Sequence, residues 1–276
     1  MANGDNVGEI VGTKTLFRYP GGKYYALKYL RKFVSTRHTE YREPFVGGGS
    51  VFFDKAKVRH NWINDFDDEL IKCYQTIQNP VTREILTDRF SDEIANKTRY
   101  SEVKLFTPTN DFEIAWKYYY MNRTSFSGKM ISPSWGYREK RSLPPSRWHE
   151  RINPCGEKLE NVKITCLDFE DVIAAPSDDE VLMFVDPPYF NPTKKKHYRH
   201  GFTHSDHVRL CESLKSTKHK FVLTYDDCEE IRELYSWANI HELEFFYRVG
   251  DSQTSNAQRK LGFELIITNF IVHQED

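Results

Sequence analysis

The amino-acid sequence predicts an α/β protein built around a largely parallel β-sheet. Five consecutive apolar residues, Val181–Val185, indicate a strand buried on both faces, as inner strands of parallel sheets are. Strand and helix patterns alternate before residue 79 and again after residue 156, which is typical of βαβ units. Residues 79–156 lack this alternation. We therefore expect one catalytic domain formed by residues 14–78 and 157–276, with a mainly helical domain, residues 79–156, inserted between them.

The predicted strand at Val181–Val185 is followed directly by groups that suit a binding site. Proline cannot donate to a sheet ladder, so Pro187 and Pro188 end the strand. Ligands of open α/β sheets bind just beyond the carboxyl ends of the strands. At that position Asp186 and the Pro187 carbonyl offer two hydrogen-bond acceptors, and Tyr189 offers a flat ring. These groups suit a planar ring with an exocyclic amino group, such as adenine or cytosine. The alternative is an ordinary turn with a solvated Asp186 and Tyr189 at its rim.

Two glycine-rich segments lie near the N-terminus. Gly21-Gly22 comes directly before Lys23. The apolar residues that follow, in Tyr24–Val34, share one helical face and predict a helix. Gly47-Gly48-Gly49 lies between a short strand-like segment and a second apolar run. Glycine lets the backbone approach a ligand closely, but neither segment matches the Walker loop or the dinucleotide-binding fingerprint. Taken alone, each is also compatible with an ordinary turn.

An acidic residue ends the next predicted strand, His60–Asp65. It lies about 20 residues after the glycine loop, where α/β nucleotide-binding folds place the acid that binds ribose hydroxyls. Acidic residues then enrich the first turn of a helix whose apolar face includes Leu70 and Ile77. Asp65 is therefore a candidate ribose ligand, with an N-cap of this helix as the alternative.

The insertion carries a local positive charge. Between Ile114 and Cys155 eight Lys and Arg residues stand against two acids, which gives +6 in a chain whose net charge is −1. Seven aromatic residues are interleaved with them. Basic and aromatic residues together suit phosphate contacts and base stacking, although a solvated, loop-rich insertion would have a similar composition.

The remainder of the chain returns to strands and helices. Strands are predicted at Val162–Leu167 and Phe221–Thr224, and helices around Val208–Leu214 and at Glu229–Ser236. The chain is expected to close with an antiparallel pair of strands, Ile240–Arg248 and Leu261–Val272. Residues 191–201 contain four basic residues and no acid, so we expect a mobile basic loop beside Asp186.

Bulk properties exclude several other classes of protein. The five cysteines show no metal-ligand spacing, so we predict reduced thiols in a cytoplasmic protein and no metal site. No apolar run approaches the roughly 18 residues of a membrane span. Met1–Thr13 lacks a signal-peptide core and is expected to be a flexible tail. We expect a monomer in solution.

Five motifs, taken together and in this order, resemble the Dam-type adenine-N6 DNA methyltransferases. They are Arg18-Tyr19-Pro20-Gly21-Gly22-Lys23, Glu43-Pro44-Phe45-Val46-Gly47-Gly48-Gly49-Ser50-Val51, Asn64-Asp65, Asn122-Arg123 and Asp186-Pro187-Pro188-Tyr189. The resemblance runs from about Thr15 to Phe270. It implies a Rossmann-like fold that binds S-adenosyl-L-methionine, with a helical target-recognition domain inserted, and methyl transfer to N6 of a flipped-out adenine in double-stranded DNA.

The resemblance also assigns residues to the two substrates. By position it places Tyr19, Lys23, Phe45, Gly47, Gly49, Asp65 and Asp186 at the cofactor and Asp186, Pro187, Pro188 and Tyr189 at the target base. The basic and aromatic segments make Asn122, Arg123, Lys129, Tyr137, Arg138, Lys195 and Arg199 the candidate DNA contacts. The segment after Arg123 departs from the hairpin with which Dam reads GATC, so GATC is only one possible target.

The implied mechanism requires the target nucleotide to leave the duplex, at a cost of a few kcal/mol. Tyr189 would stack on the adenine, while Asp186 and the Pro187 carbonyl accept hydrogen bonds from its amino group. Transfer would be direct, without a covalent enzyme intermediate. Two alternatives stay open: a cytosine-N4 DNA methyltransferase, and a non-catalytic DNA-binding protein on a methyltransferase scaffold. A restriction endonuclease with the same target is a conceivable partner, and we expect the protein to be associated with the nucleoid through its DNA.

Overall fold

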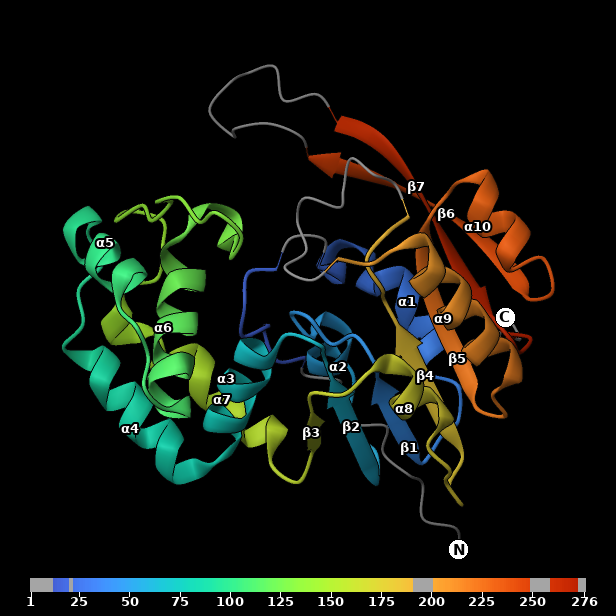
Figure 1. The fold of residues 1–276 in the computed structure, drawn as a ribbon, viewed down its shortest axis with the longest axis horizontal. Helices are drawn as coiled ribbons and strands as arrows, with labels where there is room; N and C mark the ends of the chain where they lie inside the picture. Colours follow the sequence, from blue (N-terminus) through green and yellow to red (C-terminus); the bar gives the residue numbers. More distant parts are fainter. Residues whose placement is uncertain (1–11, 20–21, 191–200, 249–258, 273–276) are drawn as a thin grey trace, which may run out of the picture.

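A seven-stranded sheet with the order β3-β2-β1-β4-β5-β7-β6 forms the centre of the protein (Figure 1). The computed structural model describes residues 12–19, 22–190, 201–248 and 259–272. The strands are β1 Glu40–Glu43, β2 His60–Asn64, β3 Lys163–Thr165, β4 Val181–Val185, β5 Lys220–Asp226, β6 Asn239–Arg248 and β7 Arg259–Thr268. The first five are mutually parallel, and β7 runs antiparallel to both β5 and β6. The predicted α/β class and the closing antiparallel pair are confirmed.

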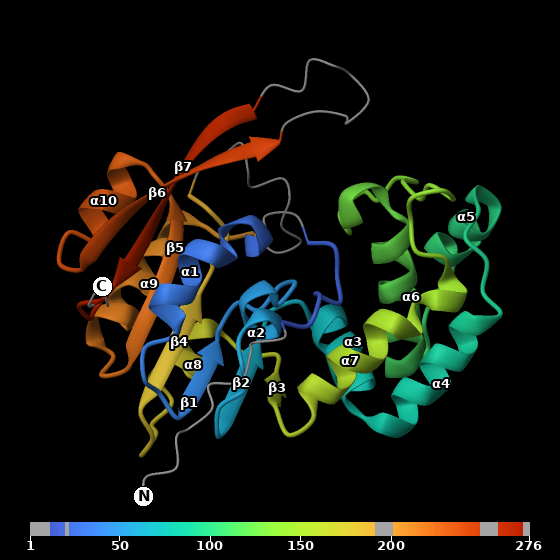
Figure 2. The ribbon, with the colours of Figure 1, turned by 180° about the vertical axis from the view of Figure 1, so that it is seen from behind.

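Helices cover both faces of this sheet. Before the insertion they are η1 Lys23–Ala26, α1 Leu27–Val34, α2 Ser50–Asp54 and α3 Asp68–Gln78; after it they are α8 Phe169–Ala174, α9 His204–Ser216 and α10 Glu229–Leu234. Figures 1 and 2 show α8, α9 and α10 on one face and α1 and α2 on the other.

Strand β4 explains why both faces need helices. All five of its side chains are buried, as predicted. Leu182 and Phe184 enter the hydrophobic cluster under α1 and α2, while Met183 and Val185 enter the cluster under α8, α9 and α10. Because alternate side chains of a strand point to opposite faces, one continuous apolar run supplies both cores.

The middle of the chain forms a group of helices beside β2 and β3 (Figure 1). They are α4 Pro80–Ser91, α5 Lys97–Leu105, α6 Asp111–Thr124, η2 Phe126–Gly128, η3 Pro145–Arg147 and α7 His149–Leu159. The helical patterns at 83–90 and 112–121 are confirmed by α4 and α6. The sequence patterns did not reveal α5, α7 and α8. Helices α5 and α8 each bury only two or three side chains, so their apolar faces are too short to show a clear period. Helix α7 contains Pro154 and Gly156, which are both unfavourable inside a helix.

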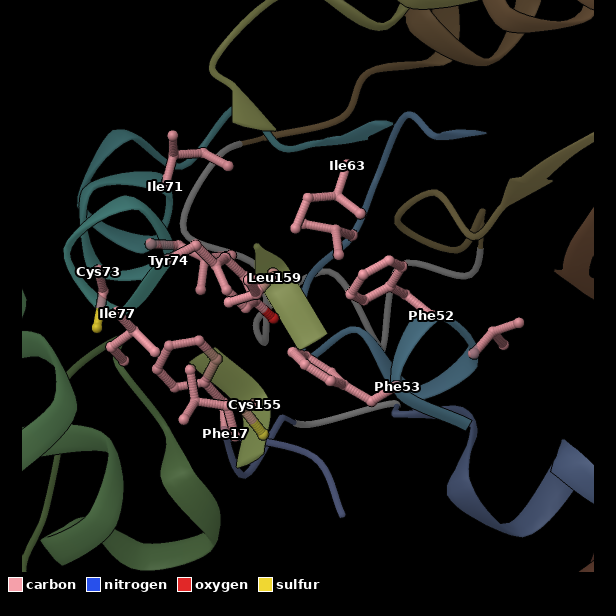
Figure 3. Packing of buried hydrophobic residues seen from close by; sticks show 14 of the residues in the cluster. Phe17, Phe52, Phe53, Ile63, Ile71, Cys73, Tyr74, Ile77, Cys155 and Leu159 are labelled. Carbon is pink, nitrogen blue, oxygen red and sulfur yellow. The ribbon is translucent and has the colours of Figure 1, made fainter. Parts of the chain in front are cut away.

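The helical group shares its core with the sheet. A single cluster of buried side chains extends from Ile63 of β2 through α3 to Trp116 and Trp148 of the insertion. Figure 3 shows part of this junction, where Phe17 lies among side chains from α2, α3 and α7. The domain limits at 79 and 156 stay a prediction.

The N-terminal segment is anchored from residue 13 onward. The Thr13 amide donates to the Phe53 carbonyl at 2.9 Å, and Leu16 and Phe17 are buried. Thr13 was predicted to belong to the flexible tail. The predicted end of the tail therefore lies too far along the chain. The rest of the predicted tail, apart from Gly12, lies outside the described residues, as do Lys195, Arg199 and nearly all of the predicted basic loop.

Candidate active site

A cavity of about 330 Å³ lies at the carboxyl ends of the parallel strands, where the strand order reverses between β1 and β4. This is the position at which open α/β sheets bind ligands. Its walls come from the segments that follow four strands: 43–51 after β1, 65–67 after β2, 167–169 after β3, and Asp186 and Pro188 after β4. The size lies in the usual range of small-molecule sites.

The glycine loop after β1 has a shape that only glycine allows. Gly47 and Gly49 adopt φ values of 46° and 65°, in the left-handed region. A Cβ on Gly48 would lie 2.7 Å from the Cβ of Tyr19, and one on Gly47 would lie 3.0 Å from the Tyr19 ring. The side chain of Tyr19 therefore packs directly on the loop, and both line the cavity.

Asp65 links the glycine loop to the end of β2. Its Oδ2 accepts from the Gly47 amide at 2.8 Å and its Oδ1 accepts from the Asp67 amide at 3.0 Å. The N-cap of α3 is Asp67, whose Oδ1 accepts from the Leu70 amide. The helix-cap interpretation of Asp65 is therefore wrong. Each carboxylate oxygen can accept a further hydrogen bond, so Asp65 can still bind hydroxyl groups from the cavity.

Asp186 stands at the other end of the cavity, and one of its oxygens is held firmly. Oδ1 accepts from the Thr224 hydroxyl at 2.7 Å and pairs with Lys23 Nζ at 2.6 Å. Thr224 comes from β5, the neighbouring strand. Since both of these interactions use Oδ1, the carboxylate plane is fixed and Oδ2 can face the cavity.

The protonation of this pair follows from its surroundings. Burial raises the pKa of Asp186 above its ordinary value, and Lys23 and Thr224 oppose that shift. Burial also works against the charge of Lys23, but Asp186, Glu264 and Asp226 outweigh it and raise the pKa of Lys23. Lys23 was predicted at the cofactor; the structure places its ammonium group on Asp186, at the start of the turn that follows β4.

Glu43 is a second buried carboxyl group in the cavity wall. Burial raises its pKa to about 8, although hydrogen bonds from the Tyr41 hydroxyl and the Phe52 amide act in the opposite direction. The Tyr41 hydroxyl lies 2.7 Å from Glu43 Oε1. Glu43 is therefore largely uncharged at neutral pH, which leaves Asp186 as the main negative charge at this end of the cavity.

Tyr189 is more enclosed than the sequence suggested. Only 4% of its surface is exposed, Lys23 Nζ lies 4.6 Å from its ring centroid, and the Tyr225 ring centre is 6.2 Å away. The alternative of a rim residue is therefore wrong. A base can stack on this ring only after the side chains that cover it move apart, so the predicted stacking requires a local rearrangement.

Three further groups at or beside the cavity were not assigned from the sequence. Thr224 and Asp226 lie on β5, and the Asp226 carboxylate accepts from the Phe190 amide at 3.0 Å, which holds the chain after Tyr189 in place. Asp168 follows β3 and lies in the cavity wall, where it accepts from Arg209 at 3.1 Å. Asp226 ends its strand and Asp168 follows one, so the rule that found Asp65 and Asp186 would have found these two once the strand order was known.

The candidate DNA contacts divide into buried and exposed residues. Asn122 is fully buried and its amide group is bonded to backbone atoms, which contradicts a direct DNA contact. Arg123 is 9% exposed. Lys129 and Tyr137 are half-buried and Arg138 is exposed. Tyr137 and Arg138 line a groove whose other walls are 95–97, 135 and 139–141.

Arg123 lies close to a second arginine, Arg18. Burial and the charge of Arg123 lower the pKa of Arg18. Within the described part of the chain neither guanidinium forms an ion pair, and Arg123 Nε is buried without a hydrogen-bond partner. Two neighbouring cations without a counter-charge are suited to bind an anion or the acceptor edge of a base.

The family model of the D12 class N6 adenine-specific DNA methyltransferases matches residues 19–249. The chain belongs to this family. The resemblance seen in the five motifs is thereby confirmed, and the protein is an enzyme that methylates adenine N6 in DNA at specific sites. The match favours adenine over the alternatives of cytosine N4 and a non-catalytic DNA-binding protein.

Curated relatives are similar along most of the chain. The Type II methyltransferase M1.LlaDCHI of Lactococcus lactis subsp. cremoris is 28% identical over 94% of this chain and 96% of its own. The Type II methyltransferase M.CviBI of Paramecium bursaria Chlorella virus NC1A is 27% identical over 85% and 91%. A DNA adenine methylase of Vibrio cholerae is 23% identical over 83% and 87%.

The described residues contain neither a membrane span nor a metal cluster. None of their helices has the length and apolar character needed to cross a membrane. No group of three or more His, Cys, Asp or Glu side chains in the same residues has an arrangement that could hold a metal ion.

Proposed function

We propose that the cavity binds S-adenosylmethionine at the glycine loop and Asp65 and receives the target adenine at Asp186. The observation that carries this proposal is that one continuous cavity joins the two places. Its volume and its glycine backbone suit a nucleoside-sized ligand, and Asp65 supplies acceptors for ribose hydroxyls. When bound, the cofactor supplies an electrophilic methyl group on a positively charged sulfur.

The aromatic residues of the cavity wall support the placement of the cofactor's adenine ring. The Phe45 and Phe169 rings stack with their centres 5.4 Å apart, and Phe66 is 60% exposed where it borders the cavity. Apolar and exposed aromatic rings along one cavity wall suit a flat heterocycle packed against them. Phe45 was predicted as a cofactor residue; its role as a wall of the adenine site is part of this proposal.

At the target end the protein positions an amino group. Asp186 Oδ2 and the Pro187 carbonyl accept hydrogen bonds from N6, which turns the nitrogen lone pair away from the adenine ring. Lys23 and Thr224 keep Asp186 from rotating while it does so. A fixed carboxylate also stabilises the positive charge that develops on nitrogen, and no reorganisation is needed at that moment.

The insertion, residues 79–156, is proposed to read the DNA sequence. Arg123 and Arg18 would contact a phosphate or a base edge of the DNA. A DNA strand that passes the groove at 95–97 would be contacted by Lys129, Tyr137 and Arg138. Lys195 and Arg199 stay predicted DNA contacts. A restriction endonuclease with the same target, a monomeric state and a nucleoid location are likewise predictions.

Methylation of oligonucleotides tests the proposed function directly. Duplexes of random sequence, incubated with the protein and S-adenosylmethionine carrying a labelled methyl group, should yield labelled N6-methyladenine on nucleoside analysis by mass spectrometry. Single-molecule sequencing of DNA from a host that expresses the protein would then identify the recognition site. Labelled N4-methylcytosine, or no labelled nucleoside, would contradict the proposal.

Replacing Asp65 is expected to weaken cofactor binding more than DNA binding. Hydrogen bonds to a charged acceptor are typically worth about 1.5–3 kcal/mol, so Asp65→Ala should raise the dissociation constant of S-adenosylmethionine about 10- to 150-fold in calorimetry. Asn110→Ala is the control, because Asn110 caps α6 away from the cavity and its loss lowers stability alone. Unchanged cofactor affinity in Asp65→Ala would make Asp65 a purely structural residue.

Replacing Arg123 is expected to relax sequence recognition at one base pair. A buried guanidinium with an unsatisfied Nε gains a partner only when DNA binds, and a good bidentate contact discriminates by about 1–3 kcal/mol. Methylation rates on duplexes with each single base-pair change would show this for Arg123→Ala. Arg147→Ala, which removes an arginine already paired with Glu150, should leave discrimination unchanged. A uniform loss on all duplexes would instead indicate a phosphate contact.

A further inference from the structure

The side chain of Asn122 makes hydrogen bonds that belong to another part of the chain. Its Oδ1 accepts from the Arg18 amide at 2.9 Å, and its Nδ2 donates to the Arg18 carbonyl at 2.8 Å. Nδ2 also donates to the Gly128 carbonyl at 3.2 Å. A carboxamide is the side-chain group that can pair in this way with both the N–H and the C=O of one residue. Asn122 thus holds Arg18 as a neighbouring strand would, although the two are 104 residues apart.

Gly128 packs directly against the backbone of Arg18. Its φ is +70°, and a Cβ built on it would lie 2.3 Å from the Arg18 carbonyl oxygen. No side chain fits in that space. The end of α6 and the turn that follows it therefore fit closely around the backbone of Arg18.

The preceding residue is held by the same helix. The Phe17 ring, which is 3% exposed, makes edge contacts with Tyr74 of α3 at 5.0 Å and Tyr118 of α6 at 5.6 Å between ring centres. Figure 3 shows Phe17 and Tyr74 within this packed group. Segment 17–18 is thus attached to the recognition insertion by both apolar packing and hydrogen bonds.

The residues that follow this attachment act in the catalytic cavity. Tyr19 packs on Gly47 and Gly48 of the glycine loop. Lys23, four residues later, pairs with Asp186 and lies over the Tyr189 ring. A displacement of Arg18 would therefore move both the group that supports the cofactor loop and the group that fixes the catalytic carboxylate.

We propose that Asn122 is a positioning residue: it ties the recognition helix α6 to the segment that carries Tyr19 and Lys23, and so sets the geometry of the cofactor and the catalytic turn. This positioning role takes the place of the DNA contact that was predicted for Asn122. The inference rests on the proposed function, because it takes Tyr19 to act at the cofactor and Lys23 at the target base.

Two substitutions of Asn122, assayed beside a control on the same helix, test this role. Asn122→Asp keeps the size and the acceptor for the Arg18 amide but replaces the group that donates to two carbonyl oxygens with a carboxylate oxygen, which only accepts. Asn122→Ala removes all three bonds. The control is Thr124→Val, because Thr124 is also fully buried on α6 but donates only to Tyr120 of its own helix, at 2.7 Å. All three variants are compared at a temperature at which circular dichroism shows them folded.

The expected result separates position from stability. Both Asn122 variants should bind S-adenosylmethionine about tenfold more weakly in calorimetry and show a kcat about 10- to 100-fold lower, the loss that a misplacement of roughly 1 Å produces. Thr124→Val should lower the melting temperature without changing either quantity. Gly128→Ala, which presses on Arg18 from the other side, should reproduce the Asn122 result. If Asn122→Asp does not fold, Asn122→Ala and Gly128→Ala carry the test.

One outcome would overturn the inference while leaving the proposed function intact. Folded Asn122 variants with the cofactor affinity and kcat of Thr124→Val would show that Asn122 only stabilises the fold. The proposed function itself fails in a different way, through the absence of labelled N6-methyladenine when the wild-type protein is assayed. Assaying the wild-type protein in the same series keeps the two failures distinguishable.

Discussion

The variant Asp186→Ala is expected to lose methyl transfer while it keeps its fold and its affinity for DNA. In the proposed mechanism the Asp186 carboxylate accepts from the target amino group and faces the charge that develops on nitrogen. Removing one preorganised group of this kind typically costs about 10²–10³-fold in kcat. Single-turnover methylation of a cognate duplex with saturating cofactor measures the chemical step directly.

Two further variants show whether the loss of activity in Asp186→Ala comes from the missing charge at this position. Asp186→Asn keeps the shape but not the charge, and a loss as large as that of Asp186→Ala would assign the effect to the charge. Asp227→Asn is the matched control, since Asp227 lies just beyond the end of the adjacent strand but pairs with Arg232 at 2.6 Å. Near-normal turnover in a well-folded Asp186→Ala protein would remove Asp186 from the mechanism.

The parts of the fold that the sequence predicted share a physical cause. Strand β4 was evident because five apolar residues with no polar interruption can be satisfied only between two layers of helices. The turn after it was evident because two prolines end a strand wherever they occur. Asp65 and Asp186 could be placed at one binding site because each comes at the end of a predicted strand, and the ends of parallel strands meet at one edge of a sheet.

The parts that were missed depend on contacts between distant residues. No local pattern shows that Asn122 pairs with Arg18, because the Asn122 side chain meets the Arg18 backbone only after α6 has packed against α3 and Phe17. The same holds for Thr224, which reaches Asp186 only because β5 is the neighbour of β4. Tyr189 was expected to present its ring to the target base, but Lys23 and Tyr225 cover it. Asn122 was selected as a DNA contact because it lies beside Arg123 in a basic and aromatic segment, and its burial shows instead a polar group satisfied internally.

The variant Lys23→Met is expected to lose both stability and activity, and both losses should depend on pH. Lys23 is buried among Asp186, Asp226 and Glu264, so its removal leaves buried carboxylates without their cation. Removing one partner of a buried ion pair typically costs about 3–5 kcal/mol of unfolding free energy. Chemical denaturation at neutral pH measures this cost.

The direction of the pH dependence follows from the pKa of Asp186. Burial already raises this pKa, and Lys23 opposes the shift, so without Lys23 the pKa rises further. A carboxyl group whose pKa is higher in the folded than in the unfolded state favours folding at low pH. The stability difference between Lys23→Met and the wild-type protein should therefore be largest near neutral pH and shrink toward pH of about 4, the ordinary value for aspartate.

Activity should show the same shift on its acid side. In the proposed mechanism Asp186 acts as the ionised carboxylate, so the acid limb of the kcat profile of Lys23→Met should move to higher pH than in the wild-type protein. Lys72→Met is the control, because Lys72 pairs with the exposed Asp68 and Asp111 outside the cavity and should leave the profile in place. An acid limb that does not move, in a folded Lys23→Met protein that still methylates DNA, would show that Lys23 does not control the ionisation of Asp186; the ion pair would then serve the fold alone.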